Sequence, residues 1–360
     1  MKRQLFRLTL LLLFMPLVIF ANDKKKFKHE KTKIIKKEFA VNADALLKIN
    51  NRYGNIDIIT WNENRVVIEV KITTKGNDEE RVEDRLDDIT IVFESSRSEV
   101  SAKTIIEKTS NYSNWFSWGT NKNVQYKINY TVKAPIANRV NLTNDYGNIS
   151  LNELKGDAYI NCDYGRIDIG DLYSYNNVID INYTSNSTIG LINGGKINAD
   201  YSKFTVEKAR QIQLNADYTT SVFENVKALN YDCNYGSLKV YKAASVIGDG
   251  DYLSTRLGII LKKVKIDADY GSIRIEDLVD GFQSIDIDSD YTSVKIGIPS
   301  TAFDFEIKLS YGSFKRGENN LEFIKQLVKS SSKYYQGYFK NKNSGASIKI
   351  NSDYGSVTFQ

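Results

Sequence analysis

The sequence has little histidine, cysteine and proline, and each shortage narrows what the protein can be. Its 360 residues include 1 His, 2 Cys and 3 Pro, against 23 Tyr and a hydrophobic content of 41%. Few prolines and this hydrophobic content are typical of a folded chain rather than a disordered one. His29 lies in a lysine-rich stretch, so there is no histidine pair to bind a metal. We also find no nucleophile elbow and no phosphate-binding glycine loop.

No apolar run reaches the roughly 20 residues that a membrane-spanning helix needs. Three basic residues precede the apolar run from Leu8 to Phe20, which contains Pro16, and Ala21 follows as a small residue suited to cleavage. This order is typical of a secretory signal peptide over residues 1–21, with a permanent membrane anchor as the alternative. It predicts an exported protein, located in the periplasm, at the cell surface or in the medium.

The chain lacks a basic face of the kind that binds nucleic acid, although its net charge is +5. Residues 1–21 carry +3 and residues 22–37 carry +6, which leaves −4 for the rest. We therefore predict no nucleic-acid partner. Residues 22–37 are interpreted as a lysine-rich linker in solvent. The alternative is an electrostatic contact of residues 24–37 with anionic lipid or lipopolysaccharide.

One motif recurs along the chain: a short β-prone segment, then Asn or Asp, then Tyr, then Gly, Ser or Thr. The tyrosines of this motif are Tyr53, Tyr146, Tyr164, Tyr183, Tyr201, Tyr218, Tyr235, Tyr252, Tyr270, Tyr291, Tyr311 and Tyr354. Steps from Tyr146 to Tyr311 are 17 to 21 residues, too short for helical repeats of about 33 to 47. The pattern predicts an all-β fold, a parallel β-solenoid (β-helix) of about 18 residues per coil over residues 124–360.

Stacked coils bring equivalent positions into columns about 4.8 Å apart. The residue two places before each Tyr is mostly small, and those one and three places before it are mostly Asn or Asp. Alternation therefore predicts that the small residue and the Tyr point one way and the Asn and Asp the other. The Gly that often follows the Tyr is predicted to supply a positive φ. Cys162 and Cys233 share the small-residue column, four coils or roughly 19 Å apart, so we predict buried free thiols and no disulfide.

The tyrosine and aspartate columns each have two interpretations. The tyrosines are predicted to form a buried or half-buried ladder, with an exposed platform for sugar rings as the alternative. The Asn and Asp columns are predicted to form hydrogen-bonded ladders at turns, with weak Ca²⁺ binding as the alternative. Carboxylates that recur in every coil do not mark a catalytic site, which would break the repeat. We accordingly predict no catalytic residue, no metal ligand and no cofactor.

Two segments depart from the repeat. Residues 38–123 are predicted to form a β-rich N-terminal capping domain with one helix, which Asn77 caps and which has Glu80 three residues on. Residues 316–345 are predicted to be an insertion with a helix from Leu321 to Lys329 that covers a face or closes the C-terminal end. Caps suit a solenoid because its end coils otherwise expose unpaired strand edges.

The segment YSNWFSWGT holds two of the three Trp in the chain and lies in a polar loop outside the repeat. Because exposed aromatic clusters mark binding surfaces, our candidate ligand-binding residues are Tyr112, Trp115, Phe116 and Trp118. The alternative is that these rings plug the open end of the solenoid.

Residues 38–360 resemble the bacterial "putative adhesin" β-strand-repeat domains, a β-solenoid family of unknown function. The resemblance rests on KKEFAVNADALLKINNRYGNIDIITWNENRVVIEVKI, on YKINYTVKAPIANRVNLTNDYGNISL and on the repeated [ND]-Y-G units. The chain departs from the family pattern in its many Tyr and Asp and in the insertion at 316–345. The resemblance implies an exported solenoid.

The function that we predict is that of an exported, non-enzymatic envelope or surface protein, an adhesin-like module that recognises a glycan, lipid or protein. A structural or regulatory periplasmic protein without an adhesive role is the second interpretation. A polysaccharide-active β-helix enzyme is the third.

Overall fold

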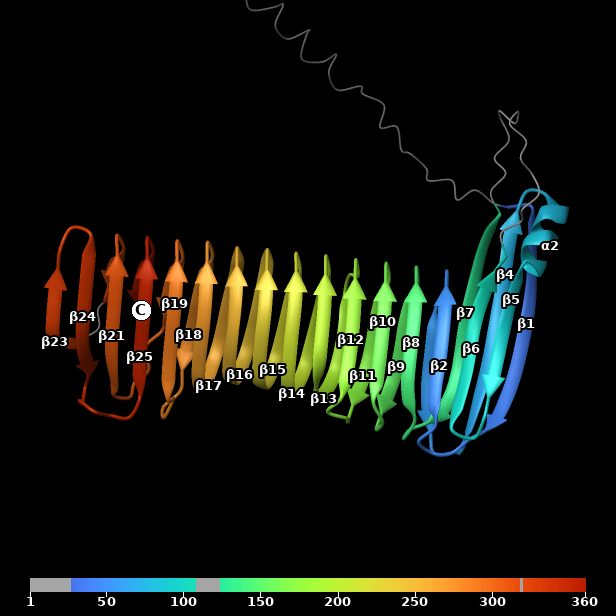
Figure 1. The fold of residues 1–360 in the computed structure, drawn as a ribbon, viewed down its shortest axis with the longest axis horizontal. Helices are drawn as coiled ribbons and strands as arrows, with labels where there is room; N and C mark the ends of the chain where they lie inside the picture. The colour runs from blue at the N-terminus through green and yellow to red at the C-terminus, as the bar shows by residue number, and fades with distance from the viewer. Residues whose placement is uncertain (1–26, 108–123, 318–319) are drawn as a thin grey trace, which may run out of the picture.

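The computed structural model describes residues 27–107, 124–317 and 320–360, whose strands join in one 26-stranded sheet. Figure 1 shows the strands side by side along the long axis, with antiparallel strands and the helix at the N-terminal end. The fold is the predicted parallel β-solenoid. The predicted signal peptide lies outside the described residues. Within them, no helix is long and apolar enough to cross a membrane.

The body of the solenoid repeats one coil, in which a tyrosine corner joins two strands that pair in parallel with the coils on either side. Its strands are β8 Arg139–Asp145, β9 Asn148–Leu154, β10 Ala158–Asp163, β11 Arg166–Leu172, β12 Asn177–Asn182, β13 Ser187–Asp200, β14 Lys203–Asp217, β15 Thr220–Asn234, β16 Gly236–Asp251, β17 Leu253–Asp269, β18 Ser272–Leu278, β19 Ser284–Asp290 and β20 Ser293–Ile296. Aliphatic and Phe side chains alternate inward along each strand and form continuous buried columns. Burial of these columns drives the coils to stack.

The two cysteines lie in the buried small-residue column, as predicted. Strand pairing connects Cys162 to Cys233 through Ile181, Ala199 and Ala216, one residue per coil. Both thiols are free and buried, and burial raises the pKa of each to about 12. Four strand steps are too far for a bridge between them, and a raised pKa keeps the thiols unreactive.

At the N-terminal end, the first coil already lies inside the segment that we predicted to be a separate cap. Strands β2 Leu46–Arg52 and β3 Ile56–Trp61 pair in parallel with β8 and β9. Beyond β3 come β7 Gln125–Pro135, β4 Arg65–Gly76 and β1 His29–Ala40, and beyond β2 come β6 Glu99–Ile106 and β5 Ile89–Ser95. Antiparallel pairing in β1, β4 and β5 thus ends the parallel repeat.

Two N-terminal predictions need correction. The lysine-rich linker predicted to end at residue 37 is a strand from His29 on, because Ile34, Ile35 and Phe39 favour extended structure and β4 offers an edge to pair with. Helix α2 Glu79–Asp87 is capped by Asp78, not by Asn77. The Asp78 carboxylate accepts the Arg81 N–H at 3.3 Å, which a residue in extended conformation just before the helix is placed to do.

The C-terminal end is closed by an antiparallel hairpin and a strand inserted out of sequence order. Its strands are β21 Phe303–Ser310, β22 Ser313–Lys315, β23 Leu321–Val328, β24 Ser332–Phe339, β25 Ser347–Asp353 and β26 Ser356–Phe359. Strand β25 lies between β19 and β21, in parallel with both, while β24 and β23 follow β21 in antiparallel order. The insertion therefore closes the end, one of the two roles predicted for it.

The helix predicted from Leu321 to Lys329 is wrong, since strand β23 occupies this segment. A short apolar run fits a helix or a strand equally well by its spacing. Here β24 supplies backbone partners along the whole segment, and only Leu321 becomes fully buried. Strand pairing with β24, and not the spacing of the apolar residues, therefore determined the structure of this segment.

Candidate functional site

The repeat tyrosines turn outward, against the prediction that they point the same way as the small residues. All twelve have a left-handed backbone, with φ between 50° and 63°. Those from Tyr146 onward are 46–64% exposed, whereas the small residues two places earlier are buried. Alternation of sides holds only for consecutive extended residues, and a positive φ interrupts it. The sequence rule failed because each coil turns its corner at the tyrosine itself.

The glycine after the tyrosine has a different role from the one predicted. None of these glycines has a positive φ. A Cβ on Gly147 would lie 1.7 Å from the carbonyl oxygen of Gly54, and one on Gly165 would lie 1.9 Å from that of Gly147. Glycine is needed because the backbones of successive coils approach closely at the corner.

The tyrosine rings form one continuous stack along the edge of the solenoid. Successive rings have centroids 4.8–5.2 Å apart and planes within 9° of parallel. The stack follows spatial order, so Tyr354 lies between Tyr291 and Tyr311. Each inner ring is covered on both faces by its neighbours. Stacking thus leaves mainly the ring edges and hydroxyls facing outward, which favours the half-buried ladder, and a sugar-binding platform along the body stays the alternative prediction.

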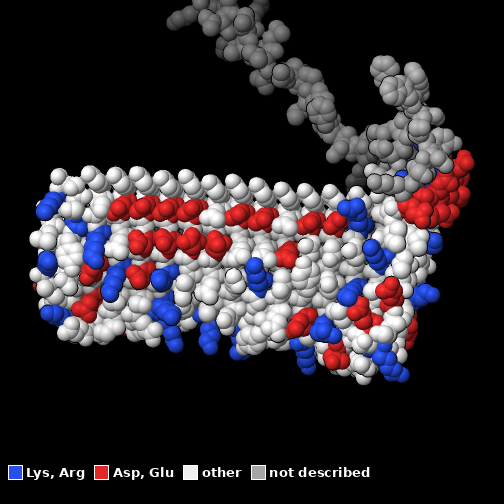
Figure 2. All heavy atoms as spheres, viewed as in Figure 1, with Lys and Arg blue, Asp and Glu red and all other residues white. Residues whose placement is uncertain are grey.

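Two rows of acidic side chains run beside the ladder, as Figure 2 shows. They are the Asp and Asn residues one and three places before each tyrosine, and they point outward as predicted. Coils are tied through them: Asp200 accepts the Asp217 N–H at 3.3 Å, and Asp163 accepts the Asn182 amide at 2.9 Å. These bonds confirm the hydrogen-bonded ladder. Among the described residues, no group of three His, Cys, Asp or Glu is placed to hold a metal.

The carboxylates of these rows also repel one another. The pKa values of Asp249, Asp267 and Asp290 are raised above the usual value, first by partial burial and then by the neighbouring aspartates. Aspartates 4.8 Å apart repel even in water, and each disfavours the charged form of the next. The body therefore presents two acidic rows, which asparagines such as Asn182 and Asn234 interrupt.

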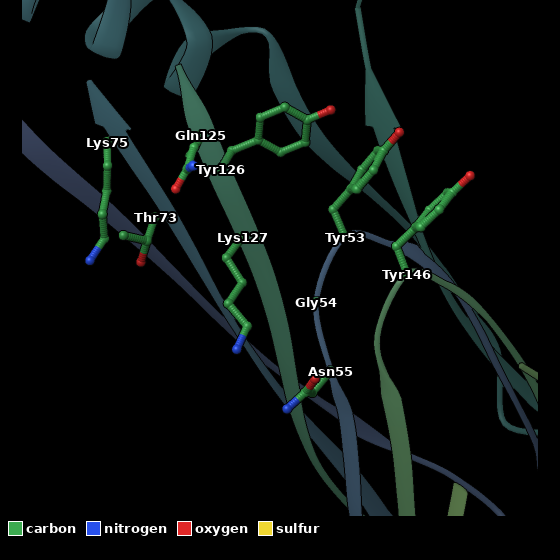
Figure 3. Close-up of a pocket in the computed structure, with 9 residues that line it drawn as sticks. All are labelled: Tyr53, Gly54, Asn55, Thr73, Lys75, Gln125, Tyr126, Lys127 and Tyr146. Atoms are coloured by element: carbon green, nitrogen blue, oxygen red, sulfur yellow. The ribbon is translucent and has the colours of Figure 1, made fainter. Parts of the chain in front are cut away.

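The N-terminal end of the ladder differs in both shape and charge. Tyr126 meets the outer face of Tyr53 edge-on, with centroids 5.2 Å apart and planes at 78°, and ends the stack. Beside it lies an open groove of about 500 Å³, shown in Figure 3. The groove is lined by Tyr53, Gly54, Asn55, Thr73, Lys75, Gln125, Tyr126, Lys127 and Tyr146. We call it the N-terminal groove.

Strand pairing explains why these residues meet. In the antiparallel pair of β4 and β7, Thr73 lies opposite Lys127 and Lys75 lies opposite Gln125. These positions alternate with buried ones, so their side chains share the outer face. Asn55 follows the first tyrosine corner, and its side-chain oxygen accepts the Asn148 N–H at 3.2 Å. Its NH₂ group keeps donor capacity.

The cations near the groove differ in how far they are neutralised. Lys75 pairs with Glu30 at 3.0 Å, Arg52 with Asp145 at 3.1 Å, and Arg85 with Asp88 at 3.5 Å. Lys127 has no carboxylate within ion-pair distance in the part of the chain that the structure describes. Of the two lysines that line the groove, Lys75 and Lys127, only Lys127 therefore has no ion-pair partner among the described residues, and its charge is available to a ligand.

Sequence reasoning missed this groove. None of its lining residues outside the ladder was a candidate. The predicted site residues Tyr112, Trp115, Phe116 and Trp118 lie outside the described residues. The described chain resumes at Val124, directly before the groove residue Gln125.

The other end of the ladder also has hollows. Tyr311 is the most exposed ladder ring, at 64%, because it has a tyrosine neighbour on one face only. A groove of about 420 Å³ there is lined by residues that include Lys308, Lys329 and Lys333.

At the N-terminal end, Lys31 of β1 forms ion pairs with Glu79 and Glu83 of α2. Contact of the lysine-rich segment with an anionic surface stays a prediction.

No family model and no curated protein matches the chain. Solved structures do. A "putative adhesin" from Parabacteroides distasonis is 13% identical, with 73% of this chain and 96% of that chain covered and a TM-score of 0.41. A "putative adhesin" from Bacteroides fragilis is 10% identical, with 91% and 97% covered and a TM-score of 0.28. A "putative cell adhesion protein" from Clostridium sporogenes is 12% identical, with 91% and 99% covered and a TM-score of 0.18.

Proposed function

We propose that the protein is an exported, non-enzymatic binding module of the cell envelope or surface, with an adhesin-like role. The observation that carries the proposal is the position of the N-terminal groove, at one end of a long solenoid where the tyrosine ladder stops and where Lys75 and Lys127 are among the lining residues. A binding site at the tip of a rod can reach a ligand while the rest of the rod spans the distance to its attachment.

The ladder supports this role because it stiffens the rod. Its eleven stacking steps extend over roughly 54 Å, and each coil is also joined to the next by parallel strand pairing. Stacked aromatic pairs contribute about 0.5–1.5 kcal/mol each beyond their buried area. A stiff support preserves the geometry of a site that it carries.

The acidic rows favour a structural role over catalysis. A general acid and a general base need different pKa values, which requires two different environments. The carboxylates of the body instead repeat one environment in coil after coil, and those of Asp200, Asp217 and Asp269 accept a backbone N–H of the next coil. Their arrangement fits a structural ladder and a charged surface.

Location and binding test the proposal together. Intact cells that produce the protein would be treated with protease, and the released peptides identified by mass spectrometry. Peptides of the body in the medium, together with saturable retention of the purified mature chain on cells that lack it, would support an adhesin-like role. Full protection and no retention would refute it in favour of a structural or regulatory periplasmic protein. The control is a periplasmic marker that stays intact.

A further inference from the structure

We propose that the N-terminal groove binds an anionic sugar, a pyranose that carries a carboxylate or a phosphate, with Lys127 as its charge partner. This inference rests on the proposed function and names the ligand class of the site at the tip of the rod. The shape of the groove, the side chains that line it and its difference in charge from the body support this inference.

The size and lining of the groove suit a sugar. At about 500 Å³ it lies within the range of roughly 300–1,000 Å³ that is usual for small-molecule sites. Tyr53 and Tyr146 offer aromatic rims on one side. In Figure 3 the polar ends of Lys127 and Asn55 point away from the tyrosine hydroxyls. A sugar has a rim of hydroxyl groups, and the polar side chains of this lining offer partners for that rim, while the tyrosine edges give apolar contact without a stacking face.

Hydrogen-bond donors dominate the polar side. The Asn55 oxygen is already engaged with the Asn148 N–H, which leaves its NH₂ to donate to a sugar oxygen. Gln125 is exposed and can donate or accept. The Lys127 ammonium supplies three donors and a full charge. Such a set favours a ligand rich in acceptor oxygens over a cationic one.

The groove differs in charge from the body. The body carries rows of aspartates along the ladder, which repel an anionic ligand. At the groove, Arg52 neutralises Asp145, the first aspartate of the row, at 3.1 Å. Lys127 then adds a positive charge without a carboxylate partner among the described residues. The aspartate rows thus end beside the groove. Helix α2 at the same end is acidic, and Lys127 supplies the positive charge within the groove itself.

The test is isothermal titration calorimetry of the purified mature chain at low ionic strength. The probes are trigalacturonate for the carboxylate, glucose 1-phosphate for the phosphate and maltotriose as the neutral sugar. We expect saturable binding of at least one anionic probe and much weaker binding of maltotriose. Lys127→Ala should weaken binding by about tenfold or more, and Lys127→Arg should retain it.

Lys133→Ala is the matched control, because Lys133 lies on the outer face of the same strand but packs over Trp61, outside the groove. It should bind within about twofold of the wild type if the interaction is local. Equal affinity in Lys127→Ala and wild type would overturn the site, as would the absence of saturable binding to both anionic probes. Unchanged retention of Lys127→Ala on cells would then leave the adhesin-like role standing with another ligand site.

Discussion

The body of the solenoid and its two ends all consist of β-strands, but they differ in strand direction, in the exposure of tyrosine rings and in the charged residues at their surfaces. In the body, pairing is parallel, ring faces are covered by their neighbours and the surface is acidic. At the ends, pairing becomes antiparallel, Tyr311 keeps an open face and lysines line the grooves. This difference shows that the repeat stiffens the body but covers the tyrosine ring faces that could otherwise contact a ligand. The places where the repeat stops keep an exposed ring and open grooves, and the proposed site lies at one of them.

The largest effect is expected from adding a Cβ at a corner of the body. In Gly147→Ala the new carbon would lie 1.7 Å from the Gly54 carbonyl oxygen, and backbone cannot move away cheaply. We expect a loss of at least about 3 kcal/mol in unfolding free energy, measured by denaturant titration. Gly190→Ala is the control, because its nearest neighbour would be 3.2 Å away. Equal losses in both variants would show that close approach is not what requires glycine at the corner.

The ladder predicts that replacing a tyrosine in its middle lowers the unfolding free energy more than replacing one at its end. Tyr218→Ala removes two stacking contacts, whereas Tyr311→Ala, at nearly the same φ, removes one. We expect a loss of about 1–3 kcal/mol for the first and about half of that for the second. Thermal unfolding followed by circular dichroism measures both. If the two losses are alike, ring stacking is not the source of the ladder's stability.

The acidic rows predict stabilisation when a charge is removed from the body. The raised pKa of Asp267 means that the folded state favours its protonated form. The stabilising contribution of that form is present at low pH and is lost as pH rises through the raised value, so the difference in melting temperature between the wild type and Asp267→Asn should shrink as the pH is lowered through that value. Asp267→Asn should stabilise at pH 7, by less than about 0.5 kcal/mol because water and salt screen the repulsion.

Asp304 at the C-terminal end provides the contrast for that experiment. Its two carboxylate oxygens accept the N–H groups of Asn343 and Ser344, at 3.1 and 3.2 Å. Asp304→Asn replaces one acceptor by a donor and should destabilise. Should Asp267→Asn destabilise as well, repulsion within the body would be refuted.

The smallest effect concerns the edge strands at the two ends. Strand β1 carries lysines along its edge, whereas β23 exposes Ile324, Leu327 and Val328 at 50–55%. Lysine on an edge strand discourages pairing with another chain, and exposed apolar side chains favour it. Leu327→Lys should lower the light scattering of concentrated protein and change the unfolding free energy by no more than about 0.5 kcal/mol. Thr32→Lys, on the already basic β1, should leave scattering unchanged.

Much of the body could be read from the sequence, because a repeated residue reports one environment many times. The Tyr spacing predicted the coils, and the small residues and aspartates before each Tyr predicted inward and outward columns. The direction of the tyrosines could not be read in this way. A positive φ at a non-glycine residue is uncommon, and alternation assumes that it does not occur.

The ends could be predicted only in outline. A cap was expected at the N-terminal end, and an insertion that covers a face or closes the end was expected at the C-terminal one. The Leu321–Val328 segment becomes a strand because β24 pairs with it, and β25 enters between β19 and β21. The groove residues come from the corner before β3, from β4, from β7 and from the corner after β8, and together they span residues 53 to 146. No local pattern indicates that Lys127 and Asn55 line the same hollow.

The sequence by itself determined the solenoid, the length of its coil and the identity of each column, because these depend on local alternation and on a period that recurs. Tertiary structure alone decided how the ladder ends, which rings keep a free face and where a groove with a lysine opens. Those features depend on strand pairings between segments distant in the chain, and the energy of such pairing is not encoded in any single stretch of residues.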